Sequence, residues 1–161
     1  MIEIVIDEPF LSLVDPLRLE RAADAALQCA GASPECDLTV VVSSDEQLQQ
    51  LNQQYLGIDA PTDVLSFQAD ELDPETGRRY LGDVIISYPQ ARTQAETGGH
   101  AALDELLLLV VHGVLHLLGH DHGAQAEKEK MWAVQAEALA RLGIAISSPP
   151  KSPASEMASD K

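Results

Sequence analysis

Four of the chain's five histidines lie in one short stretch, HGVLHLLGHDH, residues 112–122. His112 and His116 are four residues apart, which places both imidazoles on one face of a helix, one turn apart. Gly119 can end that helix, because glycine adopts a positive φ without strain, and the chain can then bring His122 back toward the first two histidines. Three neutral imidazoles in this layout are typical of a catalytic zinc site with an open position. The sequence therefore predicts one zinc ion per chain, bound by His112, His116 and His122.

Three other polar residues lie near this pattern. Asp121 stands between candidate ligands, and it could orient a ligand imidazole, act as a general acid or base, or cap the turn. We expect His120 to face solvent. We expect His100, which precedes the helix, to be a surface residue rather than a ligand.

The same histidine spacing occurs in zinc proteases, which carry a glutamate directly after the first ligand as their general base. Here that position is Gly113, which has no side chain. Zinc could still activate a water molecule, but peptide hydrolysis by the standard route is not available. The residue therefore argues against a metalloprotease, and a glycine in such an apolar helix indicates close packing.

Residue periodicity predicts four strands and about five helices around this motif. β-Branched runs indicate strands at residues 2–6, 37–43, 64–67 and 80–87. Capping residues and glycine stops indicate helices at residues 15–30, 44–54, 89–97, 102–118 and 124–142. Residues 69–79 are polar and rich in turn formers, so we expect a mobile excursion there. The pattern favours an α/β (α+β) sandwich with a small mixed sheet, in which the apolar helix carrying the histidines is the core helix.

Length and composition point to one domain, residues 1–146, followed by a Pro- and Ser-rich tail, residues 147–161, that we expect to be disordered. Two cysteines without a disulfide framework, and an N-terminal segment without signal-peptide features, predict a cytoplasmic protein. The run ELLLLVVHGVLHLLG is too short for a membrane span and predicts a buried helix. The net charge of −16 is explained by solubility and the host environment, or by repulsion from nucleic acid, and a local basic groove can coexist with it.

Three motifs in order resemble one known family. HGVLHLLGHDH resembles the H-G-x-L-H-L-x-G-[YH]-D-H signature of the YbeY-type endoribonucleases, the bacterial rRNA maturation factors. LNQQYLGIDAPTDVLSF (residues 51–67) resembles the family's L-N-x-x-Y-R-x-x-D-x-P-T-D-V-L-S-F-P segment, and LGDVIIS (residues 81–87) its L-G-D-I-x-I-S strand. The resemblance covers residues 2 to about 142. It implies a single-strand-directed, metal-dependent endoribonuclease of 16S rRNA 3′-end maturation and ribosome quality control, with the small ribosomal subunit as partner and no DNA substrate.

The chain departs from that family pattern at two positions. Leu56 stands where the family usually has an arginine thought to contact RNA, and Gln68 stands where it has a proline. Arg78, Arg79 or Arg92 could replace the missing guanidinium. The acidic charge and Leu56 also keep a second hypothesis open, a ribosome-assembly binding protein whose zinc is mainly structural. Three ligands rather than four argue against that closed type of site and favour the hydrolase.

Overall fold

One mixed sheet of four strands forms the base of the fold in this computed structural model, which describes residues 1–119 and 125–144. The strands are β1 (Ile2–Ile6), β2 (Cys36–Ser43), β3 (Val64–Leu72) and β4 (Arg79–Ser87), in the spatial order β1-β2-β4-β3. β1, β2 and β4 run parallel, and β3 is antiparallel to β4 at the edge. The expected single α/β domain with a small mixed sheet is confirmed.

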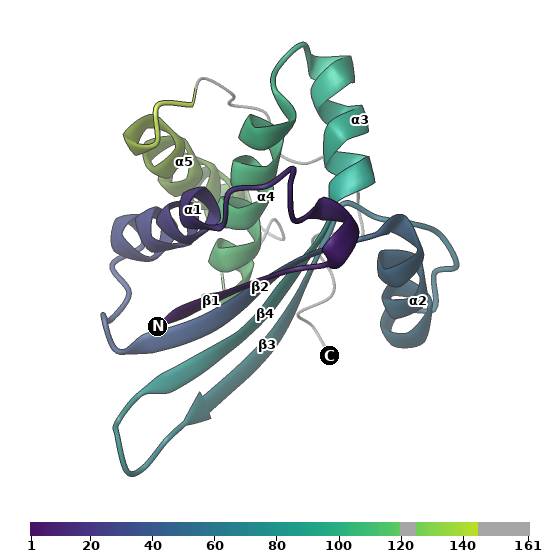
Figure 1. The fold of residues 1–161 in the computed structure, drawn as a ribbon. Coiled ribbons are helices and arrows are strands. Elements are labelled where there is room, and N and C mark those ends of the chain that lie inside the picture. Colours follow the sequence, from purple (N-terminus) through teal and green to yellow (C-terminus); the bar gives the residue numbers. More distant parts are fainter. Residues whose placement is uncertain (120–124, 145–161) are drawn as a thin grey trace.

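Helices cover the two faces of this sheet unequally (Figure 1). The helices are α1 (Pro16–Cys29), α2 (Asp45–Leu56), α3 (Tyr88–Gly98), α4 (Ala102–Leu117) and α5 (Gln125–Arg141), and a short 3-10 helix spans Glu8–Phe10. α4 lies on β3 and β4, and α1, α3 and α5 pack around α4. α2 packs on the opposite face, where Leu48 meets Leu65. Side chains alternate between the faces of a strand, so Leu65 points to α2 while Val64 belongs to the main core beneath α4.

Side-chain caps begin three of the helices. Asp15 accepts a hydrogen bond from Leu17 N (3.0 Å) before α1, and Ser44 accepts one from Gln47 N (3.2 Å) before α2. Ser87 does the same for α3. Each cap satisfies a backbone N–H that has no partner inside the helix. Asp15 and Ser44 are the first residues of the helices predicted at residues 15–30 and 44–54, so capping residues marked both starts correctly.

α4 is the central element of the core. Every residue from Glu105 to Leu117 is buried, including Leu107, Leu108, Val110 and Val111, so the prediction of a buried core helix is confirmed. Over the described ranges, no single helix is long and apolar enough to cross a membrane. α3 and α4 pass that test only as a pair, and the pair is bent by 114°.

The segment 69–79 differs from expectation. We expected a mobile excursion there, but β3 continues to Leu72 and β4 begins at Arg79, so the segment is a β-hairpin that projects from the body of the domain (Figure 1). Backbone pairing across the hairpin, with Asp73 N donating to Arg78 O at 2.8 Å, holds polar residues in strands without a hydrophobic face. Arg79 also forms an ion pair with Asp70 (2.6 Å).

Candidate metal centre and its surroundings

Two of the predicted ligands lie side by side inside the core. His112 and His116 are 0% and 1% exposed, and their rings meet edge to face, with centroids 4.7 Å apart and an interplanar angle of 72°. The two Nε2 atoms are 3.1 Å apart. α4 positions both rings because one helical turn separates them.

Gln135 on α5 determines which nitrogen of His112 carries the proton. Its Oε1 atom lies 3.0 Å from His112 Nδ1, and Gln135 is itself buried, at 2% exposure. An amide oxygen only accepts hydrogen bonds, so Nδ1 is the donor and Nε2 of the neutral ring keeps its lone pair. That lone pair points toward His116. Sequence reasoning missed Gln135, although it is a polar residue on the same side of α5 as the buried Met131 and Ala138, and that placement is a usable signal.

The histidine pair fits a zinc ion. Two nitrogen ligands at the usual Zn–N distance of about 2.0–2.1 Å in a tetrahedron lie about 3.3 Å apart, close to the observed 3.1 Å. The third predicted ligand, His122, lies outside the described residues, as do Asp121 and His120. In the part of the chain that is described, no group of three His, Cys, Asp or Glu side chains could hold a metal ion. The zinc ion, its three histidine ligands and the role of Asp121 therefore stay predictions.

Gly113 brings α4 into direct contact with the sheet. Ser66 Oγ on β3 donates a hydrogen bond to Gly113 O (3.0 Å), and a Cβ atom on Gly113 would lie 2.5 Å from Val84 Cγ1 on β4. No larger residue fits unless the Val84 side chain moves. Side chains of the sheet therefore occupy the space that the glutamate of a zinc protease would need at this position. The expected close packing is confirmed.

Gln68 closes the end of the helix that carries the histidines. Its Nε2 donates to His116 O (3.0 Å) and to Leu117 O (3.2 Å), in the last turn of α4. Carbonyl groups at a helix end have no partner within the helix, so an amide donor stabilises them. A proline, which the resembling motif has here, offers no side-chain donor. Gln68, which replaces the family's proline, thus caps α4 next to the candidate ligand His116.

Leu56 and the three arginines considered for RNA contact differ in their surroundings. Leu56 ends α2 and packs with Leu48 and Leu65, on the face of the sheet opposite α4. Two of the three arginines are held by carboxylates: Arg78 binds Asp37 (2.6 Å), and Arg79 binds Asp70 as described above.

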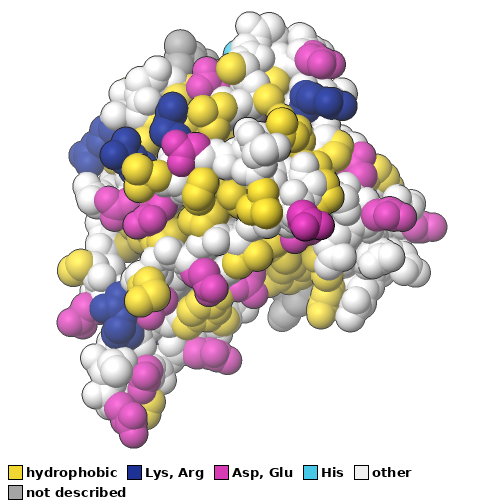
Figure 2. Space-filling view, in the orientation of Figure 1, with side chains coloured by type: hydrophobic (Ala, Val, Ile, Leu, Met, Phe, Trp, Pro, Cys, Tyr) yellow, Lys and Arg dark blue, Asp and Glu magenta, His cyan; other side chains and the backbone are white. Residues whose placement is uncertain are grey.

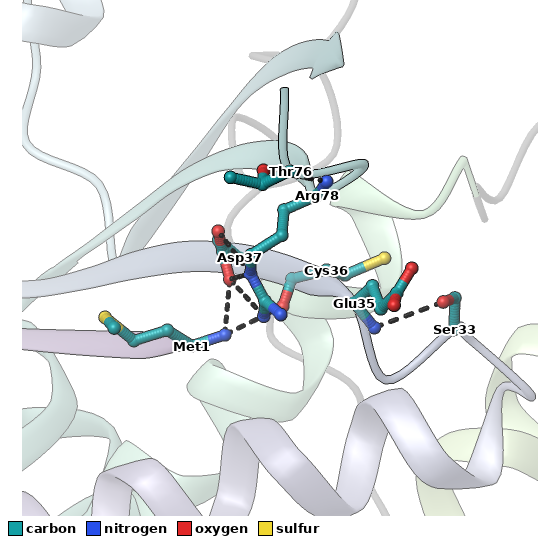
Figure 3. Close-up of polar contacts among 7 residues, drawn as sticks. All are labelled: Met1, Ser33, Glu35, Cys36, Asp37, Thr76 and Arg78. Carbon is teal, nitrogen blue, oxygen red and sulfur yellow. Dashed lines mark hydrogen bonds and ion pairs between the residues drawn. The ribbon is translucent and has the colours of Figure 1, made fainter. Parts of the chain in front are cut away.

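Asp37 is shared by two cations (Figure 3). The Met1 amino group contacts the same carboxylate as Arg78. Hydrogen bonds from Arg78 and then from that amino group lower the pKa of Asp37 to about 2. Arg92, by contrast, is exposed on α3. A guanidinium paired with a carboxylate offers less to a phosphate, so Arg78 is a poor replacement for the family's arginine.

A second buried polar cluster lies where α3 meets α4. His100 Nε2 contacts Glu105 Oε1 (2.6 Å), and the His100 side chain is only 20% exposed, so the expectation of a surface histidine is wrong. Its physical reason is the buried Glu105 carboxylate, which needs a partner. Asp63 is also buried and accepts hydrogen bonds from Val64 N (2.8 Å) and Gln94 Nε2 (3.3 Å). Burial raises the pKa of Asp63 to about 6.

Comparison with known proteins assigns this fold and its histidine helix to one family. The family model Endoribonuclease YbeY matches residues 14–143. The endoribonuclease YbeY of Roseiflexus sp. (strain RS-1) is 40% identical over 149 residues, covering 89% of this chain and 93% of that protein. The corresponding protein of Pelotomaculum thermopropionicum is 41% identical, covering 88% and 92%. The solution structure of TM1509 from Thermotoga maritima superimposes with a TM-score of 0.57 at 27% identity, covering 91% and 95%. This chain therefore belongs to the endoribonuclease YbeY family.

Proposed function

We propose that this protein is a zinc-dependent endoribonuclease that hydrolyses phosphodiester bonds in single-stranded RNA. The observation that carries the proposal is the pair of facing Nε2 atoms of His112 and His116, 3.1 Å apart on a buried helix. The names of the relatives supply the class of substrate, since each is an endoribonuclease. We propose His122 as the third ligand.

The residues around the pair have separate tasks in this proposal. Gln135 holds the proton on His112 Nδ1, which leaves Nε2 to coordinate. Ser66 and Gln68 fix the backbone of α4 at Gly113 and His116, so that both rings keep their relative position. A zinc ion bound there supplies charge neutralisation at a phosphoryl oxygen and an activated water or ribose hydroxyl. Asp121 is proposed to orient a ligand imidazole or to act as an acid or base.

The proposed substrate within the cell is the precursor of 16S rRNA at its 3′ end, with a further role in ribosome quality control on the small subunit. The support is the resemblance of the three sequence motifs, together with family membership over residues 14–143. A cytoplasmic location fits this role, and Cys29 and Cys36 are both free thiols, as a reducing compartment would leave them. We propose no DNA substrate.

One observation favours a second candidate, a ribosome-assembly binding protein with a mainly structural zinc. Arg78 and Arg79 are both paired with carboxylates, and Figure 2 shows Lys and Arg side chains on this face interspersed with acidic ones. A weak basic surface lowers the affinity for RNA, because phosphate neutralisation dominates such binding. The third alternative, a metalloprotease, is opposed by Gly113. This buried glycine packs against Val84 at the position where a zinc protease carries its glutamate.

The deciding experiment is an RNA cleavage assay with purified protein. Single-stranded RNA is incubated with the wild type, with the wild type plus chelator, and with His116→Ala, and casein serves as a control substrate. We expect cleavage of RNA that is lost with chelator and in the variant, and no cleavage of casein. Equal RNA cleavage by wild type and His116→Ala would indicate a contaminating nuclease. RNA binding without cleavage, despite bound zinc, would support the binding protein instead.

A further inference from the structure

One side of α5 leads from the histidine pair to a tryptophan. Lys128, Trp132 and Gln135 follow one another at spacings of four and three residues, which places them along the same stripe of the helix. Gln135 is the member that touches His112. Trp132 and Lys128 are both partly exposed. The stripe therefore connects the candidate metal centre with the protein surface.

An ammonium group occupies the face of the tryptophan ring. Lys128 Nζ lies 4.7 Å from the centroid of the Trp132 ring, within the range of a cation–π interaction. The indole Nε1 atom is buried although the residue is partly exposed, so the ring is set into the protein by one edge. In the described ranges, no carboxylate forms an ion pair with Lys128. The ring and the lysine thus form a preassembled pair of an aromatic surface and a cation.

The energies favour exchange of the ammonium for a nucleobase. A partly exposed cation–π contact contributes about 0.5–1 kcal/mol. Stacking of a base on an aromatic side chain contributes about 1–3 kcal/mol and tolerates any base. A base that takes the ring face would release the ammonium of Lys128, which could then contact a phosphate of the same strand. Single-stranded RNA offers both groups in one nucleotide.

We propose that Trp132 and Lys128 form a subsite for one nucleotide of single-stranded RNA beside the histidine pair, with the base stacked on the indole and the ammonium on the phosphate. This inference rests on the proposed function, because it assigns part of the RNA path for the same site. It also supplies a cation on the side of the sheet that carries α4 and α5, whereas Leu56 lies on the opposite face and Arg78 and Arg79 are already paired.

The chain itself provides a direct reporter, because Trp132 is its only tryptophan. Intrinsic fluorescence is followed while the wild-type protein is titrated with a short 2′-O-methyl oligoadenylate, and binding is measured in parallel by anisotropy of the same RNA carrying a dye. We expect the tryptophan emission to be quenched with the same midpoint as the anisotropy change. Binding without a change in tryptophan emission would overturn the subsite.

Variants separate stacking from general electrostatics. Trp132→Leu, which keeps an apolar side chain without an aromatic face, should weaken RNA binding about 5- to 150-fold, and Trp132→Phe should restore most of it. Lys128→Ala should reduce the salt slope of binding by up to about one unit, whereas Lys130→Ala, exposed on the same helix, should change it little. Equal effects of the two lysine variants, or equal binding by Trp132→Leu and wild type, would contradict the proposal.

The outcomes also distinguish this inference from the proposed function. RNA cleavage that is abolished by chelator, combined with unchanged binding by the Trp132 and Lys128 variants, would refute the subsite and leave the nuclease intact. Neither cleavage nor RNA binding by the zinc-loaded wild type would refute both. Thermal unfolding of each variant shows whether it is folded, and Trp132→Phe provides a second variant of similar shape should Trp132→Leu be unstable.

Discussion

His112 Nδ1 and Gln135 Oε1 lie 3.0 Å apart although 23 residues separate them in the sequence. The contact joins α4, which carries the histidine pair, to α5, and it is buried at both ends. Because the amide oxygen requires a donor, the contact selects the tautomer of His112 that can coordinate through Nε2.

The first prediction tests this contact. Gln135→Met should lower zinc affinity by about 10- to 100-fold, because the imidazole loses the partner that fixes its tautomer and orientation. Gln135→Glu should restore most of the affinity, since a carboxylate also accepts from Nδ1. Competition against a chromophoric chelator gives the affinities. If Gln135→Met binds zinc as tightly as the wild type does, the tautomer is not set by this residue.

The second prediction concerns the contact of α4 with the sheet. Gly113→Ala should lower the free energy of unfolding by about 1–3 kcal/mol, because its Cβ would lie 2.5 Å from Val84 Cγ1. Adding Val84→Ala should recover part of that loss, which a double-mutant cycle in urea measures as a coupling energy. Gly113→Glu should be more destabilised and should show no peptidase activity. Strict additivity of the two alanine substitutions would contradict the steric explanation.

The third prediction concerns the cap on α4. Gln68→Met should lower the free energy of unfolding by at most about 1 kcal/mol, since Gln68 is exposed and its hydrogen bonds compete with water. The loss should be local, so amide exchange at Leu118 and Gly119 should accelerate while exchange at Leu109 is unchanged. Gln49→Met is the matched control, because Gln49 on α2 donates an amide hydrogen bond to Asp59 in the loop that follows the helix. Acceleration at Gly119 in the control would show that the effect is not specific to this cap.

The fourth prediction is a pH dependence of stability. The folded-state pKa of Asp63 is raised to about 6 from an ordinary value of 3.8, chiefly by burial. A raised pKa means that stability is greatest while the carboxyl is protonated and falls as pH rises from about 4 to above 6. The loss is of the order of 3 kcal/mol.

Comparing the wild type with Asp63→Asn isolates the contribution of Asp63 to the pH dependence of stability. Urea unfolding of both proteins from pH 4.5 to 7.5 should show that the wild type loses more stability with rising pH than the variant does. Asp73→Asn is the control, because hydrogen bonding from Glu75 N lowers the pKa of exposed Asp73 below its ordinary value of 3.8, so its contribution to stability stays constant across this pH range. Parallel stability curves for wild type and Asp63→Asn would refute the prediction.

Sequence periodicity predicted most of the fold because most elements are defined by local signals. Asp15 and Pro16 mark the start of α1, and the uninterrupted apolar run of α4 indicates a helix buried on all sides, as observed. Periodicity failed at residues 69–72, where cross-strand hydrogen bonds rather than side-chain burial keep the chain extended. The spatial order, with β4 inserted between β2 and β3, depends on long-range pairing that no local pattern encodes.

The site was predictable only where chemistry and spacing are local. His112 and His116 could be placed together from one helical turn. Gln135 and Gln68 reach them from another helix and from an edge strand, and an amide side chain carries no spacing rule of its own. His100 was misjudged for the same reason, because its burial depends on the tertiary position of Glu105.

The hydrogen bond between His112 and Gln135 also joins two segments that are synthesised one after the other. Domains acquire structure from the N-terminus onward as the chain emerges. The sheet and α4 can assemble before α5 exists, but until Gln135 docks, the ring of His112 is free to carry its proton on either nitrogen. If the chain binds zinc as proposed, both histidines would be in place before the coordinating tautomer is selected, and zinc loading would be delayed until the domain is nearly complete.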